Sequence, residues 1–138
     1  NNNQGNLMNE QQVIDLLNET SKYTFKKEKD NFSRYDAFCE EHGVMLEIKC
    51  RRAFYDDTLI EKMKYDWNTK YANDNNYKFI YAVSMPKDGK ETIYLFHPDK
   101  LNISWFTKKL PAQTDFGRKE WIDKEIAYIP IVDAVATR

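Results

Sequence analysis

Two apolar segments that flank a short turn signal constrain the fold of this chain more than any other feature. Residues 32–40 and 44–52 are rich in aromatic, β-branched and other apolar side chains, and Glu41-His42-Gly43 separates them. This pattern predicts two antiparallel strands joined as a hairpin. If the hairpin closes on Glu41-His42, the numbers of opposed residues sum to 83; closure on His42-Gly43 gives 85.

Polar residues interrupt both segments at positions that share one face. Glu47 and Lys49 alternate with apolar residues and therefore project together from the second strand. Asp36 then lies across from Glu47 in the first closure and across from Lys49 in the second, whereas a three-residue loop would turn it away. Opposed, partly buried carboxylates repel each other unless a positive charge lies between them. The pattern predicts a Mg²⁺ site, since Mg²⁺ prefers carboxylate and water ligands. The alternative is a solvated edge strand, with Asp36 paired to a nearby arginine.

The rest of the chain adds helices and strands on both sides of the hairpin. Periodicity predicts helices over 7–19 and 58–72, and strands over 23–27, 77–85 and 92–97, with a turn at 86–89 and a strand or helix over 121–131. This order indicates an α/β fold with a central mixed sheet flanked by helices. Residues 7–138 have the length of a single domain. The Asn-rich residues 1–6 are expected to be a linker, a disordered segment or the edge of a larger protein.

Both predicted helices carry a charged residue on the side that faces the sheet. Glu10 shares one side of the first helix with the apolar positions 13, 14 and 17. A carboxylate directed toward a core is costly unless it is paired or ligates a metal. Lys64 lies between Ile60 and Trp67 on the second helix, so a cation is directed to the same layer. Snorkelling to solvent is the alternative for both side chains.

These residues resemble a known pattern, that of the PD-(D/E)XK nuclease superfamily of restriction enzymes, Holliday junction resolvases and phage nucleases. Its core is a helix, a three-stranded meander carrying D-x(n)-E-x-K, a second helix and a further strand. This chain reads Asp36, ten residues, then Glu47-Ile48-Lys49, with Tyr35 where the proline of the name stands. The resemblance covers residues 7–85 and includes Glu10 as the acid on the first helix.

The resemblance implies a restriction endonuclease-like α-β-β-β-α-β core and a metal-dependent endodeoxyribonuclease. Glu10, Asp36 and Glu47 would hold Mg²⁺, for which Mn²⁺ would substitute, and Lys49 would position the attacking water. Phage-type nucleases are nearest in size and layout, so a phage-encoded origin is compatible with the sequence. Two rival hypotheses are a nuclease-fold domain that binds nucleic acid or assembles without turnover, and a domain that does not recognise nucleic acid.

Basic residues near the hairpin are the candidate contacts for DNA phosphates. They are Lys27, Arg34, Arg51, Arg52 and Lys64. The net charge of -1, from 21 basic and 22 acidic residues, provides no global positive field, so these residues must act locally. Cutting both strands of a duplex requires two sites, so a homodimer is expected.

Cysteine placement and hydropathy bear on the environment of the protein. Cys39 and Cys50 are out of cross-strand register, which predicts free, buried thiols. No apolar run approaches the ~20 residues that span a bilayer, and the N-terminus lacks the layout of a signal peptide. A soluble, cytoplasmic protein with no membrane partner is therefore expected.

Overall fold

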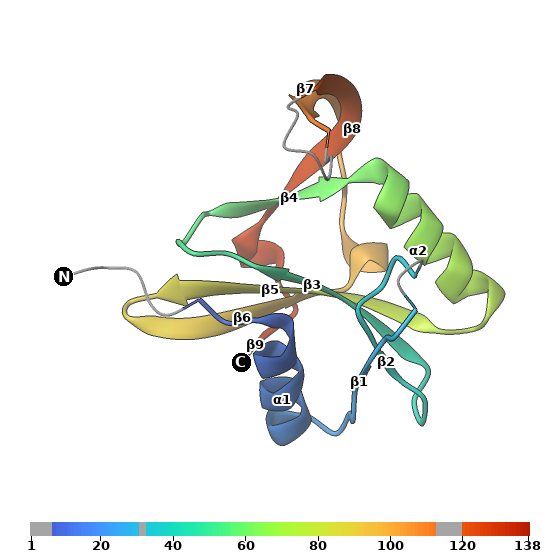
Figure 1. Ribbon diagram of the computed structural model, residues 1–138, viewed down its shortest axis with the longest axis vertical. Coiled ribbons are helices and arrows are strands. Elements are labelled where there is room, and N and C mark those ends of the chain that lie inside the picture. The colour runs from blue at the N-terminus through green and yellow to red at the C-terminus, as the bar shows by residue number, and fades with distance from the viewer. Residues whose placement is uncertain (1–6, 31–32, 113–119) are drawn as a thin grey trace.

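Two helices and two sheets make up the part of the chain that the structure describes. The computed structural model describes residues 7–30, 33–112 and 120–138 (Figure 1). One sheet has the strand order β1 (Lys26–Lys27), β2 (Ala37–Cys39), β3 (Val44–Cys50), β5 (Lys78–Lys87), β6 (Lys90–Phe96) and β9 (Ala136–Thr137). The other has the order β4 (Asp57–Glu61), β8 (Trp121–Pro130) and β7 (Phe106–Pro111). The helices are α1 (Glu10–Thr20) and α2 (Lys62–Asp74), with 3-10 turns η1 (Pro98–Lys100) and η2 (Ile131–Asp133).

The central hairpin has the first of the two predicted registers. β2 pairs antiparallel with β3 through Ala37 with Leu46, Phe38 with Met45 and Cys39 with Val44, so the residue numbers of each pair sum to 83. Gly43 completes the turn at a φ of 64°, a left-handed conformation that glycine adopts without steric cost. The larger sheet is mixed, because β3 is parallel to β5 while its other pairs are antiparallel. The predicted α/β class is confirmed.

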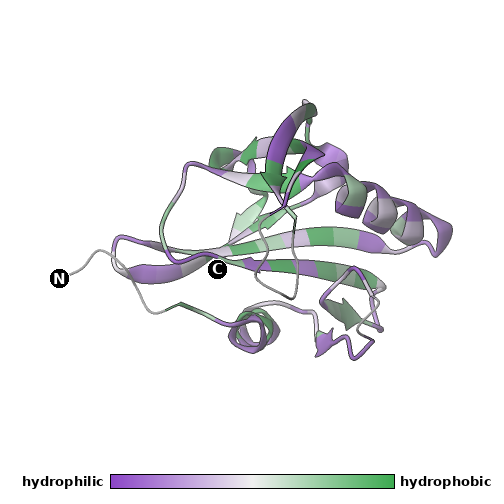
Figure 2. Cartoon of the chain, turned by 45° about the horizontal axis from the view of Figure 1, so that its top comes forward, coloured by the Kyte–Doolittle hydropathy of each residue, from purple (hydrophilic) through white to green (hydrophobic). Residues whose placement is uncertain are grey.

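The larger sheet carries a hydrophobic cluster on each face. On one face, α1 packs Val13, Ile14 and Leu17 against Leu46 and Ile48 of β3. On the other face, α2 and the smaller sheet pack against the alternate residues of β3 and β5; this cluster includes Met45, Ile60, Ala72, Tyr81, Val83, Ala127 and Ile129. In Figure 2 the central strands are largely hydrophobic and α2 is largely hydrophilic, as expected of a helix that buries one narrow stripe. The layers are therefore α1, the six-stranded sheet, and α2 with the smaller sheet.

The predicted second helix begins too early. Residues 57–61 form β4 instead, and α2 starts at Lys62. Thr58 and Ile60 are buried while their neighbours are more exposed, a two-residue period that fits their pairing with β8. The predicted inner face was only partly right: Lys64 is exposed but lines one pocket with Glu47, whereas Asn68 and Ala72 are the buried residues of α2.

The first two predicted strands are shorter than expected. Only Lys26–Lys27 of the predicted strand over 23–27 pairs with β2, which itself covers Ala37–Cys39. The chain bends over residues 34–36, just before β2, and Ser33 N–H donates to the Asp30 carbonyl (3.1 Å). Phe32, the predicted start of that strand, lies outside the described residues. The first helix begins at Glu10 rather than Leu7.

The later part of the chain follows the predicted strands. Residues 121–130 form β8, which settles the open choice between strand and helix. The turn over 86–89 narrows to Asp88 and Gly89, whose φ values of 51° and 79° suit the two-residue turn of a β-hairpin between Lys87 and Lys90. Cys39 and Cys50 are free thiols as predicted, although only Cys39 is fully buried.

Candidate active site

Glu47 and Lys49 lie on the half of β3 that has no β2 neighbour. β2 begins at Ala37, opposite Leu46, so the ladder between the two strands ends before Glu47. Asp36 takes its place: its Oδ2 accepts a hydrogen bond from Ile48 N–H at 2.7 Å, and its own N–H donates to the Leu46 carbonyl at 2.8 Å. The carboxylate of Asp36 is therefore fixed at the open edge of β3, beside Glu47.

Glu10 reaches the same edge from the opposite layer. The Asn9 side chain accepts from Gln12 N–H at 2.8 Å while Asn9 N–H donates to Gln12 Oε1 at 2.9 Å, a capping box that starts α1 at Glu10. Glu10 is thus the first helical residue and half-buried, rather than a member of the buried stripe as predicted. Its carboxylate is within hydrogen-bonding reach of Asp36.

The three carboxylates form a continuous acidic cluster at the edge of β3. Burial, and then the charge and hydrogen bonding of Asp36, raise the pKa of Glu47 to about 8, against the opposing effects of Lys64 and Lys49. The same two causes raise the pKa of Glu10, opposed by Lys27. The cluster therefore retains protons at pH values at which isolated carboxylates have lost them.

Lys49 is held in an environment that disfavours its charge. Burial lowers the pKa of this ammonium, and the nearby cations Lys64 and Arg51 lower it further; Glu61 and Glu47 act in the opposite direction. A lysine with a lowered pKa exchanges a proton more readily near neutral pH than a solvated one. Lys49 is therefore suited both to donate hydrogen bonds to an anion and to exchange a proton with bound water.

Three residues that the sequence did not single out complete the surroundings. Tyr81 pairs with Glu47 in the parallel ladder and is buried, which raises the pKa of its hydroxyl. Glu61, at the end of β4, forms an ion pair with Lys124 of β8 at 2.8 Å, and together with Lys64 and Lys49 this partner lowers its pKa despite burial. Tyr81 and Glu61 line one pocket with Glu47, Lys49 and the third of these residues, Asn68.

Asn68 ties α2 to the segment that carries Asp36. It is 1% exposed, and its Nδ2 donates to the Arg34 carbonyl at 3.2 Å. Its Oδ1 is buried and has no partner among the described residues. Because β2 has not yet begun at Arg34, this bond is one of the contacts that fix the chain just before Asp36. Asn68 and Tyr81 could not be found from local sequence, since their positions depend on the packing of α2 against the larger sheet and on the pairing of β5 with β3.

The predicted phosphate contacts lie in different settings. The charge of Lys27 opposes the rise in the pKa of Glu10, and the charge of Lys64 opposes the rise in the pKa of Glu47. Both lysines therefore lie beside the acidic cluster. The Arg34 guanidinium lies 5.9 Å from the centre of the Trp67 ring. Arg51 turns toward β4, with Nη2 3.4 Å from Thr58 Oγ1. Arg52 is exposed.

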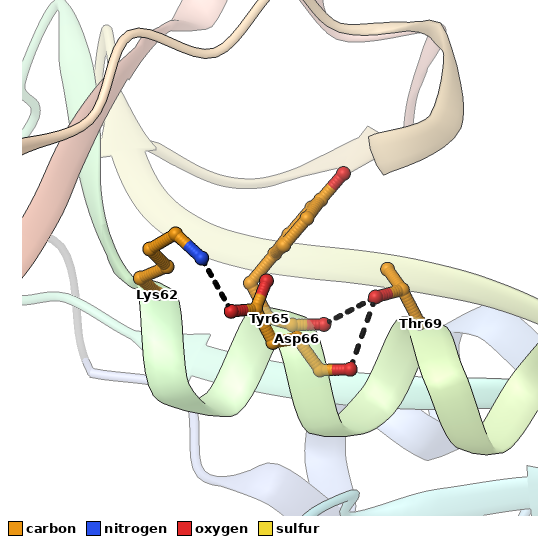
Figure 3. A network of polar contacts seen from close by, with 4 residues as sticks. All are labelled: Lys62, Tyr65, Asp66 and Thr69. Carbon is orange, nitrogen blue, oxygen red and sulfur yellow. Dashed lines mark hydrogen bonds and ion pairs between the residues drawn. The ribbon is translucent and has the colours of Figure 1, made fainter.

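Polar and charged groups on the neighbouring surface of α2 pair with one another. Lys62 forms an ion pair with Asp66 at 2.6 Å, and the Thr69 hydroxyl donates to the Tyr65 carbonyl at 2.8 Å (Figure 3). Tyr65 extends away from this network, and its ring lies edge-on to Trp105, 5.3 Å away between centres. Lys64 takes no part in the drawn network and acts on Glu47 instead.

The donor chemistry of the acidic cluster suits a hard divalent cation. Glu10, Asp36 and Glu47 supply carboxylate oxygens only, and after burial the charge of Asp36 is the next cause that raises the pKa of both Glu47 and Glu10. In residues 7–30, 33–112 and 120–138, however, no three His, Cys, Asp or Glu side chains are arranged as a ready metal site. The roles of the three acids and Lys49 as metal ligands and catalytic groups therefore stay predictions.

Comparison with known proteins adds no family assignment. No family model, curated protein or solved structure matches the chain. Within the described residues, neither helix is long and apolar enough to cross a membrane.

Proposed function

We propose that this protein is a divalent-metal-dependent nuclease that hydrolyses phosphodiester bonds in DNA. The observation that carries the proposal is the convergence of Glu10, Asp36 and Glu47 at the open edge of β3, with Lys49 projecting beside them. Three acids and a lysine from two layers of the fold meet there, although 25 residues separate Glu10 from Asp36 along the chain. Their approach costs free energy in the absence of a cation, so a structural role alone explains it poorly.

The arrangement of secondary structure supports the same proposal. Helix α1, the strands β1 to β3, helix α2 and the parallel strand β5 follow the order that the PD-(D/E)XK resemblance implies. The inserted β4 precedes α2 and leaves the parallel pairing of β3 with β5 intact. We therefore assign the chain a restriction endonuclease-like core as part of this proposal.

Each residue of the cluster has a task that follows from its position. Glu10, Asp36 and Glu47 would hold Mg²⁺ or Mn²⁺, which would polarise a phosphoryl oxygen and favour deprotonation of a bound water. Lys49 would orient the attacking water and donate to the phosphate oxygens as negative charge develops on them. Lys27 and Lys64 flank the cluster and would attract the phosphates on either side.

The leading rival is a nuclease-fold domain that binds nucleic acid or mediates assembly without turnover. A site that only binds a polyanion gains nothing from clustered carboxylates, because each of them repels phosphate. A different observation weighs against a domain with no nucleic-acid partner. Lys27, Lys49 and Lys64 all lie beside those acids, where they would contact phosphates. For cleavage of both strands of a duplex, the proposal includes a homodimer.

A cleavage assay with matched variants tests the proposal. Linear duplex, single-stranded and four-way-junction DNA would be incubated with the protein in Mg²⁺, Mn²⁺ or EDTA. Cleavage should require the metal and should fall by at least about 100-fold in Glu10→Gln and Glu47→Gln. Glu19→Gln is the matched control, because Glu19 is exposed on the same helix. Full cleavage by Glu47→Gln, or cleavage that persists in EDTA, would refute the proposal.

A further inference from the structure

The hairpin of β7 and β8, here called the arm, extends beyond the six-stranded sheet (Figure 1). It exposes large apolar side chains: Phe106 is 44% exposed, Ile122 41% and Tyr128 41%. Single exposed apolar residues are common, but these three come from paired strands of one hairpin. Such a group indicates a surface that meets a partner.

The two faces of the arm differ in charge. Phe106 pairs with Ile126, Lys108 with Lys124 and Leu110 with Ile122, so these residues share one face with Tyr128. β7 and β8 contribute two lysines and no acid to this face, here called the lysine face; Asp123 and Glu125 project from the other. Alternation along β4, which pairs with β8, places the acids Asp57 and Glu61 on the lysine face as well. Glu61 forms an ion pair with Lys124.

The lysine face combines a stacked aromatic pair with a cation. The rings of Phe106 and Tyr128 are stacked, with centroids 5.9 Å apart and planes 29° from parallel. Lys108 Nζ lies 3.3 Å from the Tyr128 hydroxyl and 5.8 Å from the centre of its ring. Exposed aromatic faces next to lysines bind unpaired nucleic acid, because a base stacks on the ring while the cation meets the phosphate.

The edge of the arm disfavours a second copy of this chain as the occupant. β7 is the outer strand of its sheet. If two copies of β7 paired antiparallel about its midpoint, Lys108 of each would lie opposite Lys109 of the other. Directly opposed like charges destabilise strand pairing, and lysines are a common means of blocking an edge. Lys109 is paired with Asp123 at 3.2 Å, so Lys108 is the lysine of this edge that the proposal assigns to a polyanion.

The lysine face is continuous with the candidate active site. The ion pair of Lys124 with Glu61 joins the arm to the end of β4. Glu61 in turn lines one pocket with Lys49, and its negative charge raises the pKa of that lysine. A groove between the arm and α2 is lined by the basic residues Arg34, Lys62, Lys64 and Lys124, and by the acids Glu61, Asp66, Asp123 and Glu125. The groove is therefore mixed in charge, and Lys64 and Lys124 are the cations in it that lie between Lys49 and Lys108.

We propose that the arm binds an unpaired DNA strand beside the active site, with bases against Phe106 and Tyr128 and a phosphate at Lys108. This inference rests on the proposed function, and it assigns the protein a substrate with single-stranded character, such as a flap, an overhang or the strands at a junction. A duplex would be held less well by the arm, because its bases are already stacked on each other.

Binding measured without catalysis tests the arm separately from the nuclease. Fluorescence anisotropy in EDTA would compare labelled oligothymidine of about 20 nucleotides with a duplex of the same length. We expect Phe106→Ala and Lys108→Glu each to weaken oligothymidine binding by roughly 10-fold, with less than about 3-fold change for the duplex. Lys90→Glu, at the exposed turn between β5 and β6, is the charge-matched control and should bind like the wild type.

Each outcome decides between the alternatives. Unchanged oligothymidine affinity in both arm variants would overturn the arm proposal, even if the wild type cleaves DNA. Conversion of a dimer to a monomer by Phe106→Ala in light scattering would overturn it in favour of a subunit interface. Arm-dependent binding by a wild type that never cleaves would support the arm and refute the nuclease.

Discussion

Replacement of Glu47 by glutamine should stabilise the metal-free protein at alkaline pH. The ordinary pKa of the carboxyl is 4.5, and burial beside Asp36 raises it to about 8 in the folded protein. Between these values the folded state holds a proton that the unfolded state has released. The free energy of unfolding therefore falls as pH rises from about 4.5 to about 8, and it levels off above the folded pKa.

The size of the effect follows from the same two pKa values. Their difference corresponds to an upper limit of about 5 kcal/mol at full ionisation of Glu47. Asp36 interacts with the same proton, so part of this free energy belongs to the pair and is not recovered by changing one residue. We expect Glu47→Gln to gain roughly 2 kcal/mol over the wild type at about pH 8.5, and much less at about pH 5.

Urea denaturation in EDTA at these two pH values would measure the difference. Glu19→Gln, which removes an exposed carboxylate, should follow the wild type at both. Saturating Mg²⁺ at the higher pH should restore stability to the wild type and should do so far less in Glu47→Gln. If wild type and Glu47→Gln keep a constant difference between the two pH values, Glu47 is well solvated and the argument from burial is refuted.

Four further substitutions test metal binding, backbone strain and positioning separately. Asp36→Ala should abolish Mn²⁺ binding in calorimetry together with cleavage, whereas Lys49→Ala should abolish cleavage alone; equal loss of binding would show that Lys49 has another role. Gly43→Ala should cost about 1–2 kcal/mol in thermal unfolding, because φ is 64° and the added Cβ would lie 3.1 Å from the Tyr77 ring; an unchanged Tm would contradict this. Asn68→Ala should cost about 1–2 kcal/mol and slow cleavage, since the Arg34 carbonyl loses its donor; full activity would exclude a positioning role.

Short-range patterns carried much of the fold and of the acidic cluster. Strand alternation placed Glu47 and Lys49 on one face, and the turn signal at 41–43 limited the hairpin to a few registers, of which the structure has the one that sets Asp36 beside Glu47. The alternation is a local property that a single sequence predicts, whereas the choice among the registers stayed open. Helix α1 starts at Glu10, three residues later than predicted, because the capping box of Asn9 and Gln12 begins the helix there.

The remainder depends on contacts between distant segments. Residues 57–61 became a strand because β8, more than 60 residues later, pairs with them and buries Ile60. Local spacing of Ile60 and Met63 fits a helix equally well, so the sequence could not decide between the two. Because the helix was predicted to start at residue 58, the predicted inward-facing side of α2 was only partly correct. For the same reason Asn68 and Glu61, whose positions depend on β4, were not predicted as residues of the site.

The short length of β2 explains how acids from both layers can meet. A longer β2 would continue the ladder past Leu46 and cover the edge of β3 with backbone. Instead the chain bends before Ala37, and the Asp36 side chain accepts the Ile48 N–H that a strand carbonyl would otherwise satisfy. This substitution keeps the buried N–H bonded, so the open edge carries no orphaned donor there. It also leaves room for Glu10 to approach from the α1 layer while Glu47 projects from the other face. The acidic cluster therefore depends on where β2 begins, and an insertion that extends β2 toward Arg34 should separate Glu10 from Glu47 without removing either residue.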